Sequence, residues 1–372
     1  MKNLFCLTLW FSLIFSAYGQ DYKEYLNSGI IKQHDKNYKG ALSDYNKAIE
    51  LNPQYANSYF DRGAAKGEMQ DYQGAITDYN KAVELNPQYA DAYVNRGNAK
   101  DELKDYQGAI SDYSKAIELN PQFDAVYRNR GGIKYEMNDY QGAISDYNKA
   151  IELNPKDADT YYDRALAKKK LEDYQGAISD NSKAIELNPQ FVAAYYNRGN
   201  AKKKLEDYHS AISDYNKAIE LNPQYEKAYT NRSNAKIYLQ DYQGAVSDCN
   251  KALELNPQNA NAYCDRGYSK IYLQDYQGAI SDCNKAIELN PQLGEAYNNK
   301  GEAKYHLQDY QGAITDCGEG IELNPQDGEA YCYRGLSKIK SGQKEAGCSD
   351  IKKAKDLGYK EADSFIKDNN CN

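Results

Sequence analysis

The sequence predicts an all-α fold, a solenoid of ten 34-residue helix–turn–helix repeats with a C-terminal capping helix. Three observations support this prediction. The nine prolines recur every 34 residues from Pro53 to Pro325, and no proline lies outside the series. Each repeat carries two apolar stripes with the period of a helix. The 38 tyrosines, against seven phenylalanines and one tryptophan, indicate one short motif copied many times.

The two helices are clearest when each repeat is numbered so that its proline stands at position 32. In the third repeat the first stripe is formed by positions 3, 4, 8, 10 and 14, which are Ala92, Tyr93, Gly97, Ala99 and Leu103. The second stripe is formed by positions 20, 21, 24, 27 and 28, which are Ala109, Ile110, Tyr113, Ala116 and Ile117. Two helices of roughly 14 residues each cannot bury both apolar stripes against one another alone. Neighbouring repeats must therefore stack.

Turn residues separate the stripes. An aspartate at position 16, such as Asp105, is placed to cap the second helix. The Asn-Pro pair ends that helix, because the residue before a proline is pushed out of the α region. Small residues at positions 8, 20 and 27 allow close approach of the helices, and the tyrosines at positions 4, 17 and 24 fill the space between them.

The repeats account for residues 22–361 and therefore for most of the chain. In the tenth repeat Tyr359 replaces the proline and follows Gly358, and residues 362–372 are expected to form a capping helix and tail. The expected repeat boundaries are 22–55, 56–89, 90–123, 124–157, 158–191, 192–225, 226–259, 260–293, 294–327 and 328–361.

The N-terminus differs from the repeats. Lys2 precedes an apolar run from Leu4 to Phe15, and small residues follow it, so residues 1–19 are predicted to be a signal peptide cleaved before Gln20. An uncleaved N-terminal anchor is the alternative. The apolar run is shorter than the ~20 residues that span a bilayer, so no membrane span is expected after cleavage.

These residues resemble the tetratricopeptide repeat family, which has aromatic residues at positions 4 and 24, small residues at 8, 20 and 27, and proline at 32. The resemblance implies a right-handed superhelix whose concave wall, built from the first helices, binds peptides or partner proteins. With its export signal, the chain is similar to envelope-associated members of Gram-negative bacteria. This similarity implies that the protein is periplasmic, envelope-associated or extracellular.

Charged residues at positions 7 and 11 depart from the family pattern. Most repeats have arginine at position 7, and all have lysine at 11. Aspartate recurs at 23. One hypothesis is a ladder of ion pairs between the two helices of each repeat, as between Arg96 and Asp112. The alternative is two solvated rows of charge, which would contribute little to stability.

Catalysis has little support in the sequence. His34, His209 and His306 lie in different repeats without metal-ligand spacing, and no glycine-rich phosphate loop follows a strand. We therefore expect no enzymatic activity, catalytic residue, cofactor or metal. The formal charge of −8 argues against nucleic acid as a partner.

The family's groove positions 2, 5, 6, 9, 12 and 13 predict a segmented binding wall. It begins with an acidic stretch in repeats two and three, Asp61, Glu68, Asp91, Asp101 and Glu102. A basic stretch follows, Lys169, Lys170, Lys203 and Lys204, for which a solvated helix end is the alternative. Exposed Ile-Tyr pairs then predict an apolar–aromatic patch, Ile237, Tyr238, Ile271 and Tyr272.

Seven cysteines follow the predicted signal peptide, all in the C-terminal third. Cys249, Cys283 and Cys317 replace the packing tyrosine at position 24, which predicts buried thiols. Cys348 and Cys371 are the favoured disulfide pair. The pairs Cys249–Cys264 and Cys317–Cys332 are disfavoured, because position 5 is expected to face the groove and position 24 the core.

Together these features favour an exported, non-catalytic scaffold that binds a segment of another protein or a peptide in its concave groove. The alternative is a structural or adhesive spacer of the cell envelope or surface, without a single specific partner.

Overall fold

The computed structural model describes residues 22–371, and every regular element in this part of the chain is a helix. The predicted signal peptide, residues 1–19, lies outside it. Residues 22–34 form the first helix of the first repeat. The other first helices are α3 (Ala56–Glu68), α5 (Ala90–Glu102), α7 (Asp124–Glu136), α9 (Ala158–Lys170), α11 (Val192–Lys204), α13 (Glu226–Tyr238), α15 (Ala260–Tyr272), α17 (Gly294–His306) and α19 (Gly328–Lys340).

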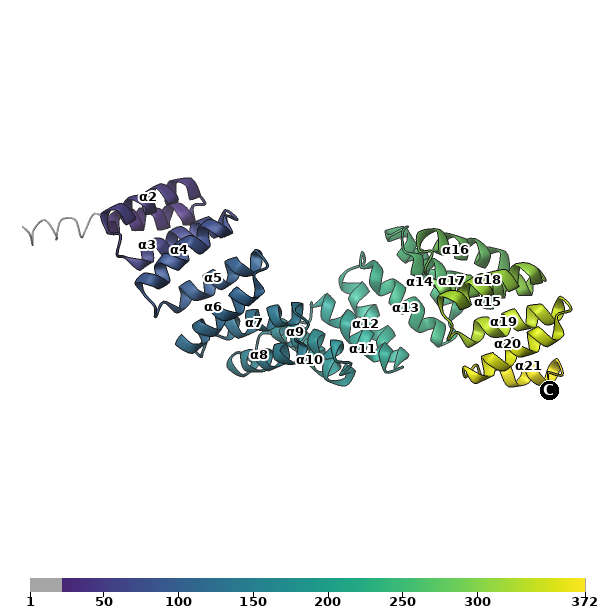
Figure 1. Ribbon diagram of the computed structural model, residues 1–372. Helices are drawn as coiled ribbons and strands as arrows, with labels where there is room; N and C mark the ends of the chain where they lie inside the picture. Colours follow the sequence, from purple (N-terminus) through teal and green to yellow (C-terminus); the bar gives the residue numbers. More distant parts are fainter. Residues whose placement is uncertain (1–21, 372) are drawn as a thin grey trace, which may run out of the picture. The chain divides into compact units, whose positions relative to one another are not determined.

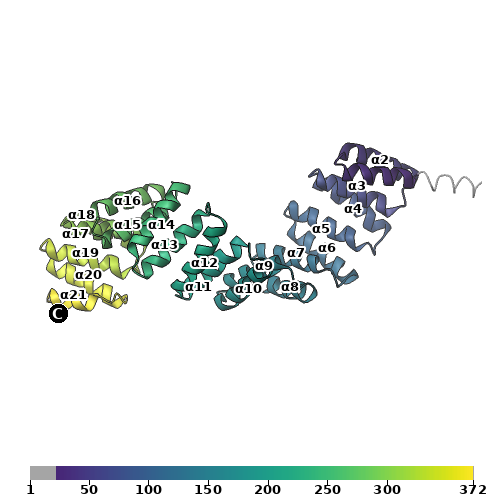
Figure 2. The same ribbon diagram turned by 180° about the vertical axis from the view of Figure 1, so that it is seen from behind.

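The second helices of the repeats begin at position 17 and, in all but the tenth, end at position 30. They are α2 (Tyr38–Leu51), α4 (Tyr72–Leu85), α6 (Tyr106–Leu119), α8 (Tyr140–Leu153), α10 (Tyr174–Leu187), α12 (Tyr208–Leu221), α14 (Tyr242–Leu255), α16 (Tyr276–Leu289), α18 (Tyr310–Leu323) and α20 (Lys344–Asp356). A short helix, α21 (Ala362–Asp368), follows. The described chain divides into two units, residues 22–173 and 174–371, and the boundary falls between α9 and α10. Within each unit, successive helices stack side by side (Figure 1, Figure 2).

The turn between the paired helices repeats one local geometry. Asp105 caps α6 by accepting a hydrogen bond from the Gly108 amide at 3.0 Å, as predicted. The residue before the cap has left-handed backbone, although it is not glycine: φ is 64° at Gln70 and 61° at Lys104. A single residue in this conformation reverses the chain between the two helices.

Close packing explains the small residue at position 8. A Cβ on Gly97 would lie 2.7 Å from Cε1 of Tyr113, whose ring is 1% exposed. In the seventh repeat, where Cys249 replaces that tyrosine, position 8 carries a side chain, Ser233. The residue at position 24 does not decide this alone, because Gly267 and Gly301 also face cysteines, Cys283 and Cys317, and a Cβ on either glycine would crowd the sulfur.

The exception at position 27 has a similar cause. Gly320 replaces alanine there, and a Cβ on it would overlap the side-chain amide of Asn298 on the facing first helix. The Asn298 amide nitrogen donates to Asp327 at 2.5 Å, which holds the side chain in this position.

The ion-pair ladder is present in repeats two to four and six to ten, and its carboxylates are buried. Asp112, 3% exposed, accepts from Arg96 Nε at 2.9 Å and Nη2 at 2.5 Å, and Lys100 Nζ lies 2.8 Å away. The interpretation as solvated charge rows is wrong, because the helices exclude water from the carboxylate. Equivalent contacts join Arg62–Asp78, Arg130–Asp146, Arg198–Asp214, Arg232–Asp248, Arg266–Asp282 and Arg334–Asp350, and Lys300 pairs with Asp316 in place of an arginine.

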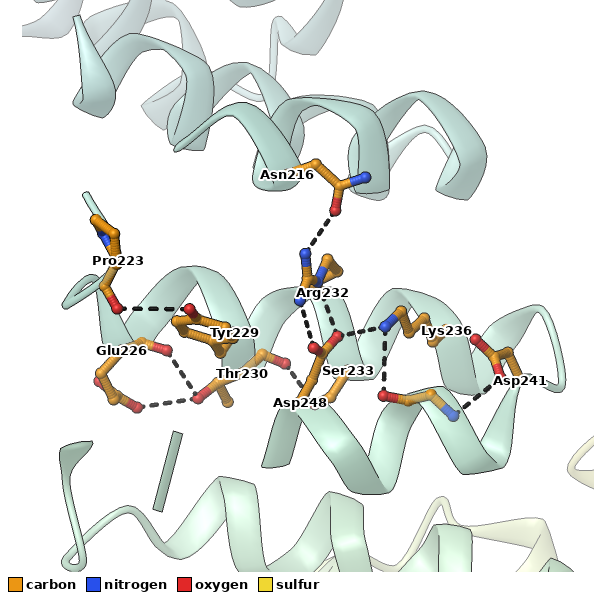
Figure 3. A network of polar contacts seen from close by, with 11 residues as sticks. Asn216, Pro223, Glu226, Tyr229, Thr230, Arg232, Ser233, Lys236, Asp241 and Asp248 are labelled. Atoms are coloured by element: carbon orange, nitrogen blue, oxygen red, sulfur yellow. Dashed lines mark hydrogen bonds and ion pairs between the residues drawn. The ribbon is translucent and has the colours of Figure 1, made fainter. Parts of the chain in front are cut away.

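The ladder also joins successive repeats. In the seventh repeat, Arg232 donates through Nη1 to Asn216 of the preceding second helix at 2.6 Å (Figure 3). Its guanidinium carbon lies 5.5 Å from the centroid of the Tyr229 ring. One arginine thus contacts a carboxylate of its own repeat, a side-chain amide of the preceding repeat and an aromatic ring.

The C-terminal end is closed as predicted. Ala362, Phe365 and Ile366 of the α21 region pack with Cys332 and Leu336 in one apolar cluster. A disulfide joins Cys348 to Cys371. The other cysteines of residues 22–371 are free and buried, so the disfavoured pairs are not formed. No helix within residues 22–371 is long and apolar enough to cross a membrane.

Candidate binding groove

The first helices of repeats seven to ten, α13, α15, α17 and α19, line a cavity of 580 Å³ within the second unit. Groove positions of these helices supply most of its wall. We call this cavity the acidic groove and define it by three tyrosines and three carboxylates, Tyr238, Tyr268, Tyr272, Asp265, Glu295 and Glu329. A 240 Å³ pocket shares Asp265 and Glu295 with it and reaches Lys203.

The tyrosines of the groove are partly exposed and held by their neighbours. Tyr238 is 60% exposed and stacks on Tyr208 with centroids 4.6 Å apart. Tyr272 is 43% exposed and stacks on Tyr242 at 4.5 Å. Tyr268 and Tyr272 are joined by a hydrogen bond of 3.1 Å between their hydroxyl groups. The prediction that Tyr238 and Tyr272 are exposed is confirmed.

The two isoleucines of the predicted patch differ. Ile237 is half-buried and lines the acidic groove. Ile271 is only 3% exposed, so its prediction as part of an exposed patch is wrong. It packs with Ala279 and Ala303, whose small side chains leave room for it between adjacent repeats.

The four lysines of the predicted basic stretch differ in burial and in their partners. Lys203 donates to the side-chain oxygens of Asn231 and Asn234, both at 3.0 Å, and burial lowers its pKa. Lys204 is exposed. In the first unit, burial and the charge of Lys170 lower the pKa of half-buried Lys169, whereas Lys170 is exposed. The solvated-end interpretation therefore fits Lys170 and Lys204 but not Lys203.

Carboxylates of the groove were missed by the sequence interpretation. Burial raises the pKa of Asp265 to about 7, although the Lys203 charge opposes the shift. Burial, followed by the charges of Glu302, Asp327 and Glu361, raises the pKa of Glu329 to about 8. The signal was available, because Asp265 stands at groove position 6 and Glu329 at position 2.

The acidic stretch of repeats two and three lies in the first unit. Burial raises the pKa of Asp61 to about 6, and Asp61 and Glu68 line a separate 420 Å³ pocket. Burial and the neighbouring Glu102 raise the pKa of Asp101. Within residues 22–371, no three His, Cys, Asp or Glu side chains are grouped so that they could hold a metal ion.

Stacked helix pairs with a groove along their first helices define a helical-repeat solenoid. The chain belongs to the tetratricopeptide repeat family, whose repeats commonly mediate protein–protein interactions and whose members are typically non-catalytic scaffolds. "Tetratricopeptide repeat" models match residues 90–123, 158–191, 192–225, 226–259, 260–293 and 294–327. A "TPR repeat" model matches residues 36–70, 68–104 and 131–172.

Solved structures agree in fold. The C-terminal part of a TPR repeat-containing protein from Cytophaga hutchinsonii is 20% identical, with a TM-score of 0.57 over 64% of this chain and 98% of its own. The APC/C hetero-tetramer Cut9–Hcn1 is 15% identical, with a TM-score of 0.55 over 97% of this chain and 89% of that one. At these identities the likeness concerns the fold alone. No curated protein matches the sequence.

Proposed function

We propose that this protein is a non-catalytic scaffold that binds an extended segment of a partner protein in the acidic groove. The observation that carries the proposal is a set of three positioned tyrosines within one cavity, of which Tyr238 and Tyr272 are exposed and Tyr268 is half-buried. Tyrosines contribute large contact area with few rotatable bonds, so binding to them costs little conformational entropy. Stacking on Tyr208 and Tyr242 lowers that cost further, because two of the rings are already ordered.

Site-specific photo-crosslinking in intact cells tests this proposal. A photoreactive residue replaces Tyr272 in the groove, and a matched control replaces Glu288 on α16, whose side chain is 67% exposed. A scaffold should give a discrete adduct from position 272, absent from position 288. The variant Tyr238→Ala, made in the same background, should abolish that adduct.

A uniform spacer or adhesive array, the alternative suggested by the similarity of the repeats, should give no such position dependence. Equal labelling from positions 272 and 288, or an adduct unaffected by Tyr238→Ala, would contradict groove binding. Circular dichroism of each variant checks that the helices remain folded.

We also propose that the protein is exported and reaches the envelope or the exterior. Its support is the charge of Lys2 before the apolar run from Leu4 to Phe15. N-terminal sequencing of the protein from fractionated cells should begin at Gln20. A chain that begins at Met1 in the cytoplasmic fraction would reject export.

A further inference from the structure

We propose that the segment bound in the acidic groove is cationic, and that a lysine or arginine side chain of the partner enters between the rings of Tyr268 and Tyr272 and the carboxylates of Glu295 and Glu329. This inference rests on the proposed function and adds the chemistry of the partner.

The groove carboxylates differ from those of the ladder in their partners. In residues 22–371, no Lys or Arg nitrogen forms an ion pair with Asp265, Glu295 or Glu329. The buried Asp248 of the ladder, in contrast, contacts both Arg232 and Lys236. Asp265 and Glu329 are partly buried, whereas Glu295 is exposed to solvent. Burying a carboxylate without a cationic partner is costly, and a bound cation would relieve that cost at Asp265 and Glu329.

The ladder of this chain contains the same arrangement with its cation in place, a guanidinium between a tyrosine ring and a carboxylate. The Arg266 guanidinium carbon lies 5.3 Å from the Tyr263 ring centroid, and its nitrogens contact Asp282 at 2.6 and 2.9 Å. Among the described residues, the lining of the acidic groove includes tyrosine rings and carboxylates but no lysine or arginine. Cation–π attraction and a charge-assisted hydrogen bond act on the same group in such a site.

Lys203 lines the neighbouring pocket and points away from the far end of the groove. Lys203 directs its ammonium group to Asn231 and Asn234 at the edge of the neighbouring pocket. At the other end of the groove, the described lining beside Glu329 and Glu361 contains no positively charged side chain. The cation of the partner is therefore expected at that end, toward α19.

Fluorescence anisotropy with three labelled twelve-residue peptides tests the inference on the full chain. The first peptide alternates lysine and leucine, the second carries acetylated lysines at the same positions, and the third carries glutamates there. The lysine peptide should bind, with at least a tenfold loss on acetylation and no measurable binding for the glutamate peptide.

Variants locate the effect. Glu329→Gln and Glu295→Gln should each weaken binding of the lysine peptide by roughly tenfold. Glu322→Gln on α18 makes the same substitution at an exposed position and should change binding less than about twofold. Using two separate groove variants keeps the test valid if one disturbs folding, which circular dichroism reports.

The outcomes separate the two proposals. If the acetylated or glutamate peptide binds as tightly as the lysine peptide and Tyr272→Ala abolishes that binding, the groove is a binding site but the cationic inference is overturned. Equal effects of Glu329→Gln, Glu295→Gln and Glu322→Gln also overturn it. If no peptide binds in a way that depends on Tyr272, the proposed function fails with it.

Discussion

Replacing Asp248 by asparagine removes one charge from the ladder while nearly preserving volume. Asp248 is 4% exposed and accepts from Arg232 Nε at 2.8 Å and Nη2 at 2.5 Å, with Lys236 Nζ at 2.8 Å (Figure 3). After the substitution, both cations remain between α13 and α14 without an anion. The asparagine amide also presents N–H donors where only donors face it.

The expected cost follows from burial. Breaking a buried ion pair by removal of one partner costs about 3–5 kcal/mol. The side chains of Arg232 and Lys236 keep 17% and 19% exposure, so both can regain some hydration. We therefore expect a loss at the lower end, about 3 kcal/mol.

Hydrogen exchange is the appropriate assay, because a solenoid need not unfold as one cooperative unit. Amides of α13 and α14 should exchange roughly a hundredfold faster in Asp248→Asn. The matched control, Glu254→Gln, breaks an exposed pair with Lys251 in the same repeat. It should change the local free energy of opening by less than about 0.5 kcal/mol.

An equal, small effect of Asp248→Asn and Glu254→Gln would refute this reasoning. It would mean that water reaches the ladder as freely as it reaches the exposed helix surface. The buried Asp248 carboxylate would then stabilise the fold no more than an exposed carboxylate does.

Three further predictions concern packing, the disulfide and pH. Gly97→Ala should lower the thermal midpoint of unfolding, since overpacking against the facing tyrosine ring costs about 1–3 kcal/mol. The control Gly67→Ala should raise the midpoint, because no atom lies within 4 Å of the added Cβ and alanine has the higher helix propensity. Reducing the Cys348–Cys371 disulfide should destabilise the C-terminal cap by about 3 kcal/mol, seen as faster exchange in α20 and α21, and unchanged exchange would contradict this. Because the pKa of Glu329 is raised to about 8, the folded state holds the proton more tightly than the unfolded state. Its contribution to stability should be complete below pH 4 and decline as pH rises toward 8. In Glu329→Gln this decline in urea-unfolding midpoints should be reduced; an unchanged pH profile would contradict the assignment.

The helices and the ladder were predictable because they depend on residues that repeat in phase. Arg96 and Asp112 stand at fixed positions of one repeat, so the pairing of two helices brings them together. The left-handed residue at Gln70 was not predictable in the same way. Glycine is the usual signal for that conformation, and here the capping Asp71 and the paired helices hold a glutamine in it.

The groove was only partly predictable, because its properties arise between repeats. Ile271 is buried by Ala303 of the next repeat, a contact that the periodicity of its own helix does not reveal. Asp265 and Glu329 are single charges in separate helices. Their raised pKa values reflect burial that exists only after stacking, whereas the exposure of Tyr238 followed from its groove position alone.

Zero-length carbodiimide crosslinking of the lysine peptide to the full chain tests the binding of a cationic segment most directly, because it joins an amine to a carboxylate already in contact. Mass spectrometry should find the peptide lysines attached to Glu295 or Glu329, and an excess of unlabelled peptide should suppress these adducts. Adducts confined to exposed carboxylates such as Glu322, in numbers unaffected by that competitor, would contradict a cation-binding groove.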